Sequence, residues 1–279
     1  MKTLFKSTLI LMSLFAMVQF SACTEKTGCT DPLALNYDPD AKKSSGDCRY
    51  ADPTPAPETT GTLKLHLHQH FGAPELDTLA VYTLPNGQRV KLNQVRYYLS
   101  NFKLKNAQNE EVSVADSYLL VNPANMDYTA GKIPAGTYKS ITFYLGIDSA
   151  TNSGGTMPTD RPAGHPLAIQ NPSMFWTWAS GYIFMRLEGL ADTIGTVAPD
   201  HALVYHLGTN ALRREVTLTL DHDLVVTAGN NSTLHVKADF KPIFEALDFK
   251  TESRTMTMGN MPLAVKIANL ATNIFSETH

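Results

Sequence analysis

Three histidines stand at every second position near the start of the chain's largest predicted domain. The segment Leu63–Gly72 reads LKLHLHQHFG, so leucines alternate with His66, His68 and His70. Side chains alternate between the two faces of a strand, so the imidazoles would share one face and the leucines the other. Neutral imidazole is a favoured ligand of copper, zinc and nickel. The segment therefore predicts either a metal-binding strand face or a solvated face that happens to carry histidines.

Both tryptophans of the chain, Trp176 and Trp178, lie two residues apart in the aromatic run Met174–Gly189. If this run were one strand, alternation would put both indoles and Tyr182 on the same face, and Gly181 would kink or bulge it. Large rings at this spacing fill the core of a β-sandwich or form a surface for stacking.

A long stretch rich in glycine, proline, serine and threonine, residues 148–173, leads directly into the aromatic run. A loop of this length inside a compact domain is either functional or disordered. It carries His165 and Met157, whose imidazole and thioether are both ligands for copper. We therefore expect the loop to form the rim or lid of a site.

Another histidine, His206, lies in the strand-like segment Ala202–Gly208. Alternation places it on the face opposite Leu203 and Tyr205. A lone histidine in a strand can be a hydrogen-bonded core or surface residue as well as a ligand, so the spacing alone leaves its role open.

Three segments together resemble the MbnP-like copper-binding proteins, periplasmic or surface proteins associated with methanobactin-type copper handling. The resemblance lies in Met-x-Trp-x-Trp-x-x-Gly-Tyr-x-Phe followed by Leu-Glu-Gly at 174–189, in Arg-Tyr-Tyr-x-Ser-Asn at 96–101, and in His-Leu-Gly at 206–208. In that family a tryptophan can be oxidised to kynurenine by a partner di-haem peroxidase of the MauG type, and the kynurenine helps to bind copper.

The resemblance also implies the residues of a copper site. A histidine shortly before a glycine at the end of the first strand matches His70, and His-Leu-Gly matches His206. We expect these two to ligate copper, with His66, His68 and His165 as reserve ligands.

The same resemblance makes Trp176 and Trp178 the candidate kynurenine precursors. Indole N–H is only a hydrogen-bond donor, so ring opening would be needed to create a nitrogen ligand. The chain has no Cys-x-x-Cys-His motif for haem attachment, so the oxidant would have to be a separate MauG-like di-haem peroxidase. We expect a binding protein and not an enzyme.

An alternative function is a non-enzymatic surface β-sandwich for adhesion or glycan binding. In that case Trp176, Trp178 and Tyr182 would form a platform on which ligand rings stack. This alternative requires exposed aromatic rings and no bound metal.

The N-terminal residues are typical of an exported lipoprotein. Lys2 and Lys6 precede the apolar run Leu9–Val18, and small residues stand immediately before Cys23. Residues 1–22 are therefore predicted to be a lipoprotein signal peptide, with lipid on the sulfur of Cys23. Lipoproteins sent to the outer membrane resemble this chain in having a residue such as Thr24 after the lipidated cysteine. We therefore expect the protein at the outer membrane, on its periplasmic face or at the cell surface.

Residues 23–60 are predicted to form a lipid anchor, a small disulfide-closed module and a Pro-rich linker. Cys29 and Cys48 form one even pair, which an exported chain would oxidise to a disulfide. The intervening sequence resembles a short Gly-Cys-Thr-Asp-Pro surface module. Asn36, Asp38 and Asp40 have the oxygen spacing of a calcium loop, but the glycine and distal glutamate of an EF-hand are missing, which favours a turn.

Residues 61–279 are predicted to form one MbnP-like all-β domain. Short strand-like segments recur between turn signals such as Asn86-Gly87, a pattern typical of a β-sandwich or a partly closed barrel. The segment Leu263–Phe275 has helical spacing and is expected to be a short C-terminal helix that caps one open end.

Net charge argues against nucleic acid as a partner. The chain has 23 Lys+Arg and 26 Asp+Glu, and loss of the signal peptide removes Lys2 and Lys6 from the basic residues. Nucleic-acid binding would require a basic face. We therefore expect membrane contact through the lipid anchor only.

Overall fold

The computed structural model describes residues 25–50, 59–177, 181–194 and 198–278. The chain divides into two compact units, Met1–Pro57 and Glu58–His279, which we describe separately. The predicted signal peptide, Cys23 and the linker residues 51–58 lie outside the described residues.

The disulfide predicted in the first unit is confirmed. Cys29 and Cys48 are bonded, with their Cα atoms 5.0 Å apart, and Cys29 is buried. Two short strands, β1 (Thr27–Gly28) and β2 (Lys43–Ser44), pair in parallel beside it. The bond therefore closes a small module with little regular secondary structure.

The oxygen-rich turn of this module is arranged around a lysine. Lys26 Nζ lies 2.8 Å from Asp38 Oδ2 and 3.7 Å from Asp40 Oδ2. Asn36 Oδ1 accepts a hydrogen bond from the Arg49 N–H at 2.7 Å. The ammonium group and the backbone contact these oxygens and hold the segment as a closed turn.

The second unit contains a larger sheet built around the long strand β5 (Arg89–Asn106), with which several other strands pair. Among the described residues its main path runs β13 (Arg214–Val226), β9 (Gly136–Leu145), β5, β11 (Gly181–Ala191), β12 (His201–Gly208) and β15 (Arg254–Thr255). Four short strands pair with it: β4 (Tyr82–Thr83), β6 (Glu111–Ser113) and β7 (Tyr118–Val121) along β5, and β10 (Phe175–Trp176) along β11.

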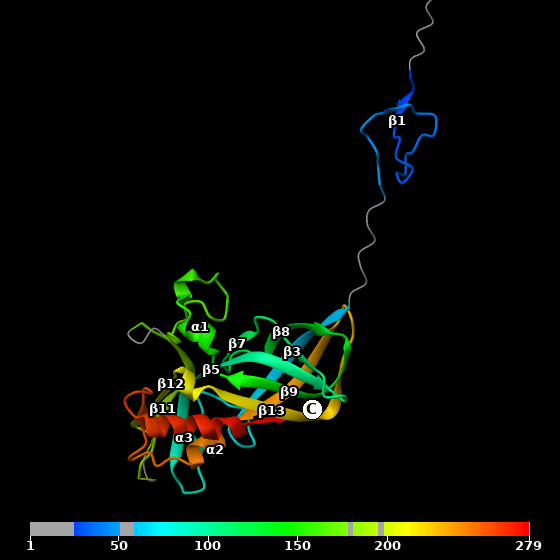
Figure 1. Ribbon diagram of the computed structural model, residues 1–279. Coiled ribbons are helices and arrows are strands. Elements are labelled where there is room, and N and C mark those ends of the chain that lie inside the picture. Colours follow the sequence, from blue (N-terminus) through cyan, green and yellow to red (C-terminus); the bar gives the residue numbers. More distant parts are fainter. Residues whose placement is uncertain (1–24, 51–58, 178–180, 195–197, 279) are drawn as a thin grey trace, which may run out of the picture. The chain divides into compact units, whose positions relative to one another are not determined.

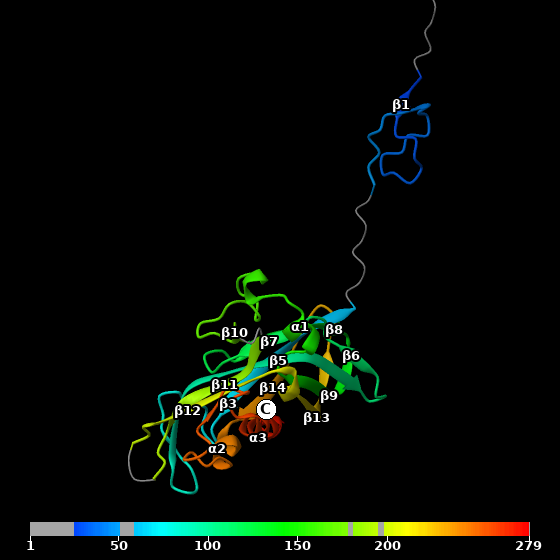
Figure 2. The ribbon, with the colours of Figure 1, turned by 60° about the vertical axis from the view of Figure 1, so that its left-hand side comes forward.

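A smaller sheet packs against the larger one (Figures 1 and 2). Its order is β16 (Phe275–Glu277), β14 (Asn231–Asp239), β3 (Thr60–His70) and β8 (Asp127–Pro134). β3 and β14 are parallel although they come from opposite ends of the domain, and β8 is antiparallel to β3.

The core lies between the two sheets. Leu63, Leu65 and Leu67 of β3 are at most 1% exposed and belong to one apolar cluster with Tyr205 and Leu207 of β12. The sheets do not close into a barrel. The predicted all-β fold is confirmed, and it is a β-sandwich.

Helix α3 (Met261–Leu270) covers part of this core, and the predicted C-terminal helix is therefore confirmed with different bounds. Asn260 caps it by accepting the Leu263 N–H, and its buried face contributes to the core cluster. The remaining helical turns are short: α1 (Ser149–Ser153), η1 (Pro158–Asp160), η2 (Asn210–Leu212), α2 (Lys241–Glu245) and η3 (Ala271–Asn273). No described helix combines the length and apolar character needed to cross a bilayer.

The aromatic run is not one strand. β10 pairs antiparallel with β11, so that Phe175 lies opposite Tyr182 and Trp176 lies opposite Gly181. The chain therefore reverses between Trp176 and Gly181, at the glycine where a kink was predicted. Trp178 lies outside the described residues.

The disulfide should supply a large part of the stability of the small unit. A double substitution of Cys29 and Cys48 by serine removes a loop closure of 19 residues, which is worth about 3 kcal/mol in the chain-entropy model. We expect the module to become sensitive to limited proteolysis in the double variant. The denaturation midpoint of Glu58–His279 provides an internal reference, and unchanged protease resistance of the module would contradict this view.

Candidate metal centre

The structure does not bring together the two histidines that were predicted to share one copper ion. His70 ends β3 and alternates with Leu67, while His206 is in β12 and alternates with Tyr205. Leu67 and Tyr205 both point into the core between the sheets. His70 and His206 therefore face outward from different sheets, and the predicted pairing is replaced by two separate locations.

The imidazole of His206 is buried and held at one nitrogen. The residue is 6% exposed, and Nε2 lies 2.6 Å from Glu188 Oε1 on the neighbouring strand β11. Its other nitrogen, Nδ1, is buried and has no hydrogen-bond partner among the described residues.

The environment of His206 favours its neutral form. Burial lowers the pKa of His206, and this outweighs the hydrogen bond to Glu188, which acts in the opposite direction. A carboxylate only accepts, so a neutral His206 carries its proton on Nε2 and leaves an unprotonated lone pair on Nδ1. A metal-binding histidine commonly has this arrangement, with a carboxylate fixing the nitrogen that faces away from the metal.

Trp176 packs on the same strand face as His206. Gly208 follows His206 by two residues, and a Cβ atom built on it would come within 2.4 Å of Trp176 Cζ3. Trp176 is itself 6% exposed. The missing side chain at Gly208 therefore provides the space in which the indole ring lies against β12.

Two arginines hold the end of the long loop over this face. Arg186 Nη2 lies 2.7 Å from Glu188 Oε1, and Arg186 Nη1 donates to the Ser173 carbonyl at 2.9 Å. Arg96 Nη1 donates to the carbonyl of Pro172 at 3.3 Å. Both arginines lie in register with each other across β5 and β11. Their contacts position the segment that leads into Trp176.

A second apolar cluster lies beneath the loop. Tyr98 Oη donates to the Pro166 carbonyl at 3.2 Å, and Tyr182 Oη donates to the Leu167 carbonyl at 3.0 Å. These bonds hold the loop as an ordered cover of the larger sheet. The buried members of the cluster are Tyr98, Ile147, Leu167, Met174, Trp176, Tyr182, Ile183 and Phe184.

His165 and Met157 lie in this loop cover but not with His206 in a ligand cluster. His165 Nδ1 accepts the Leu167 N–H at 3.0 Å, and burial lowers the pKa of His165. Met157 lines an apolar pocket of about 220 Å³ together with Tyr98 and Met174. Among the described residues, His165 belongs to no group of three potential metal ligands.

The predicted histidine face of β3 is present and is wider than the strand itself. His66 and His68 are each about one-quarter exposed at the side chain, at 23% and 26%. His235 of β14 pairs in register with His66 and joins them on the same face. Two groups have ligand atoms within 4.8 Å of one another: His66, His68 and His235, and His68, His70 and Glu75.

His235 and Glu75 were not predicted as site residues. His235 occurs in a strand of alternating polar and apolar residues, but only the parallel pairing of β14 with β3 places it beside His66. Glu75 reaches the face because the chain turns back after β3 and forms a bridge between His70 and Glu75. Neither contact follows from spacing along the sequence.

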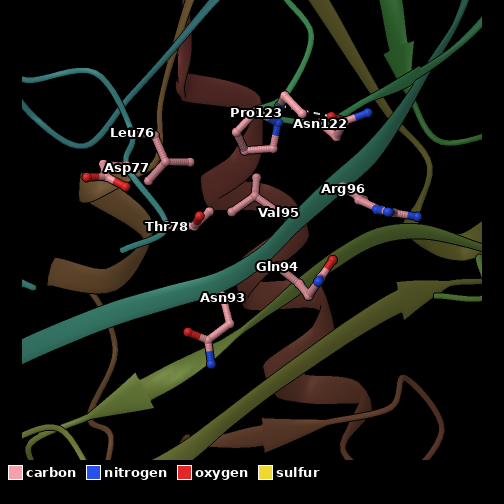
Figure 3. A pocket seen from close by; sticks show the side chains of 10 residues that line it. Leu76, Asp77, Thr78, Asn93, Gln94, Val95, Arg96, Asn122 and Pro123 are labelled. Atoms are coloured by element: carbon pink, nitrogen blue, oxygen red, sulfur yellow. Dashed lines mark hydrogen bonds between the residues drawn. The ribbon is translucent and has the colours of Figure 1, made fainter. Parts of the chain in front are cut away.

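A polar cleft of about 360 Å³ opens beside the histidine strand, where the edge of β5 is unpaired between its contacts with β4 and β7. Figure 3 shows Leu76 and Asp77 on the side of β5 toward which Val95 points, together with Pro123 and Asn122. Its lining contains no imidazole or thioether, so we give it no part in metal binding.

The burial of Trp176 and Tyr182 argues against the alternative function in adhesion or glycan binding, which requires exposed rings. Trp176 is 6% exposed and Tyr182 is 1% exposed, and both pack in the cluster beneath the loop. These two rings therefore offer no open surface for stacking.

The contact between Gly208 and Trp176 can be tested with a matched pair of variants. In Gly208→Ala the new methyl group meets the indole ring, and also the Tyr182 carbonyl at 2.6 Å. We expect overpacking to lower the free energy of unfolding by about 1–3 kcal/mol in urea denaturation. Gly259→Ala is the control, because nothing lies within 4 Å of a Cβ there. Equal stability of the two variants would contradict the proposed packing.

Comparison with known proteins agrees with the resemblance seen in the sequence. A family model for MbnP matches residues 60–259. The solved structure of MbnP from Methylosinus trichosporium is similar to this chain at 18% sequence identity, over 68% of this chain and 79% of that chain, with a TM-score of 0.48. No curated protein sequence matches. Because the family model covers most of the β domain and well over half of the whole chain, the chain belongs to the MbnP family.

Proposed function

We propose that this protein is a copper-binding lipoprotein of the cell envelope that acts in copper acquisition or storage. Membership of the MbnP family supports this proposal. The observation that carries it is the buried imidazole of His206, whose Nε2 is held by Glu188 while Nδ1 has no partner among the described residues. The protein acts as a binding protein and catalyses no reaction.

The side chains around His206 fit copper. An unprotonated imidazole nitrogen suits both oxidation states of copper, and the carboxylate behind it keeps the ring in one orientation. The nearby guanidinium of Arg186 contributes positive charge, but Glu188 Oε1 accepts from it at 2.7 Å. The neutral imidazole is therefore the group that would hold the ion in this part of the described chain.

The second ligand in this proposal comes from a tryptophan. Trp176 packs on the strand face that carries His206, and Trp178 follows two residues later, outside the described residues. Oxidation would add two oxygen atoms across the C2–C3 bond of indole, and hydrolysis of the resulting N-formyl group would release formate. A free aromatic amine then remains as a nitrogen donor. The oxidising equivalents come from peroxide through a MauG-like di-haem peroxidase partner.

Placement in the cell envelope follows from the N-terminus. Lipid on Cys23 would anchor the chain at the outer membrane, on the periplasmic face or the cell surface, and the Pro-rich residues 51–58 would separate the anchor from the β domain. This part of the proposal rests on the sequence.

The first test measures mass and metal on the same sample of protein purified from its native host. We expect at least about one equivalent of copper per chain, and a peptide containing Trp176 and Trp178 that has gained one oxygen and lost one carbon. Unmodified tryptophans with copper bound would remove the peroxidase from the proposal. Unmodified tryptophans without copper would overturn it and favour the adhesion alternative.

The second test substitutes the proposed copper ligand. His206→Gln keeps a side chain that can donate to Glu188 but removes the imidazole lone pair, so we expect the purified variant to lose the copper equivalent held at this site. His201→Gln is the matched control, because His201 is exposed at the start of the same strand. Equal copper content in both variants would show that His206 is not a ligand.

A further inference from the structure

We propose that the outward face of the smaller sheet is a second metal site, in which His66, His68 and His235 bind one divalent transition-metal ion, with Cu²⁺ preferred. This site is separate from His206 and requires no modified tryptophan. The argument rests on the pairing of two strands, the orientation of the rings and the charge around them.

Strand pairing brings the three imidazoles together. β3 and β14 are parallel and in register, so His235 lies beside His66, and alternation puts His68 on the same face. The ring centres are 4.6 Å apart between His66 and His68, 5.0 Å between His66 and His235, and 5.8 Å between His68 and His235. Their ligand nitrogens lie within 4.8 Å of one another, close enough to converge on one ion after small rotations of the rings.

An oxygen acceptor orients the imidazole of His66 from behind. His66 Nδ1 lies 2.7 Å from Asp127 Oδ1, and because a carboxylate only accepts, this nitrogen donates and Nε2 keeps its lone pair. His70, the last histidine of the strand, lies outside the proposed ligand set and donates in the same way from Nδ1 to the Ala73 carbonyl at 3.2 Å. A metal-binding histidine typically has its outer nitrogen held by a carboxylate or a carbonyl.

Carboxylates also balance charge at this face. Glu75 Oε1 lies 3.9 Å from His68 Nδ1, and Asp127 is bound to His66. These two carboxylates favour a cation near the imidazoles, while Lys237, in register with His68, contributes an opposing charge to the same face. The His68, His70 and Glu75 group shares His68 with this site, so we treat the two groups as one site with His70 and Glu75 at its edge.

The donor set selects the metal. Imidazole suits copper, nickel and zinc, and the affinity of a given nitrogen site rises along the divalent series to Cu²⁺. The face is partly open to solvent, with His235 exposed, so an ion can enter without movement of the fold.

The experiment uses the full mature chain produced without a di-haem peroxidase, so that its tryptophans are unmodified. Cu²⁺ alone is titrated into the metal-free protein, and binding is followed by calorimetry and by electron paramagnetic resonance. We expect one tight equivalent with superhyperfine splitting from several nitrogens. Absence of a nitrogen-coordinated equivalent would overturn the proposal without affecting the copper site at His206, which is tested on modified protein.

Variants assign the ligands. His235→Asn removes an exposed side chain, so the fold should persist, and we expect the Cu²⁺ affinity to fall at least tenfold with loss of nitrogen splitting. Asp127→Asn should weaken binding roughly 10–100-fold through the orientation of His66. His201→Gln is the control and should bind as the parent does, because His201 is exposed and lies on the larger sheet. Parent-like affinity in His235→Asn would contradict this site.

A parallel titration with Zn²⁺ tests whether the site prefers Cu²⁺ to Zn²⁺. The donor set predicts tighter binding of Cu²⁺ than of Zn²⁺, measured by competition between the two ions. Tighter binding of Zn²⁺ would overturn the assignment to copper, and His235→Asn would then show whether the same three imidazoles hold zinc.

Discussion

Burial of the leucine face of β3 against the larger sheet is the constraint on which the rest of the domain depends. Leu63, Leu65 and Leu67 are almost completely buried, and they join strands from both sheets in one core. Shifting the strand by one residue would exchange its two faces and place imidazoles in the core, where they would lack partners. The same apolar burial that stabilises the sandwich therefore holds the histidines outward. It also keeps the outward faces of the two sheets on opposite sides of the core, so His206 and His70 lie on different faces of the domain.

The outer face of the larger sheet is built in the opposite manner, because it is covered and not open. Arg96 and Arg186 reach from neighbouring strands to carbonyl oxygens of the loop, and tyrosines donate to other carbonyls of the same loop. A loop that contains only two short helical turns thus satisfies backbone acceptors with side chains of the sheet beneath it. The result is a low-dielectric space in which burial lowers the pKa of His206 and Trp176 is excluded from water.

Sequence patterns correctly predicted those features that are determined by residue types and their spacing along the chain. Period-two alternation identified β3 and its two faces, the pair Cys29 and Cys48 indicated a disulfide, and the family resemblance pointed to the correct family. The aromatic run was interpreted as one strand because alternation alone cannot distinguish a strand from a tight hairpin whose two arms are both apolar. The joint role of His70 and His206 was also predicted from motif positions. Such positions carry no information on which sheet a strand joins, and the separation of the two histidines could be seen only in three dimensions.

The parallel pairing of β3 with β14 has a consequence for how the chain matures. β3 is near the beginning of the domain and β14 is near its end, so this pairing closes a very long loop. Contacts between residues so far apart in the sequence form slowly during folding. During synthesis from the N-terminus, the chain contains His66 and His68 long before it contains His235. Three imidazoles can therefore converge only when the last strands have docked. A metal ion would therefore bind this face only after folding is complete. Because the ion would bind the native state and not the unfolded chain, it would stabilise the native state.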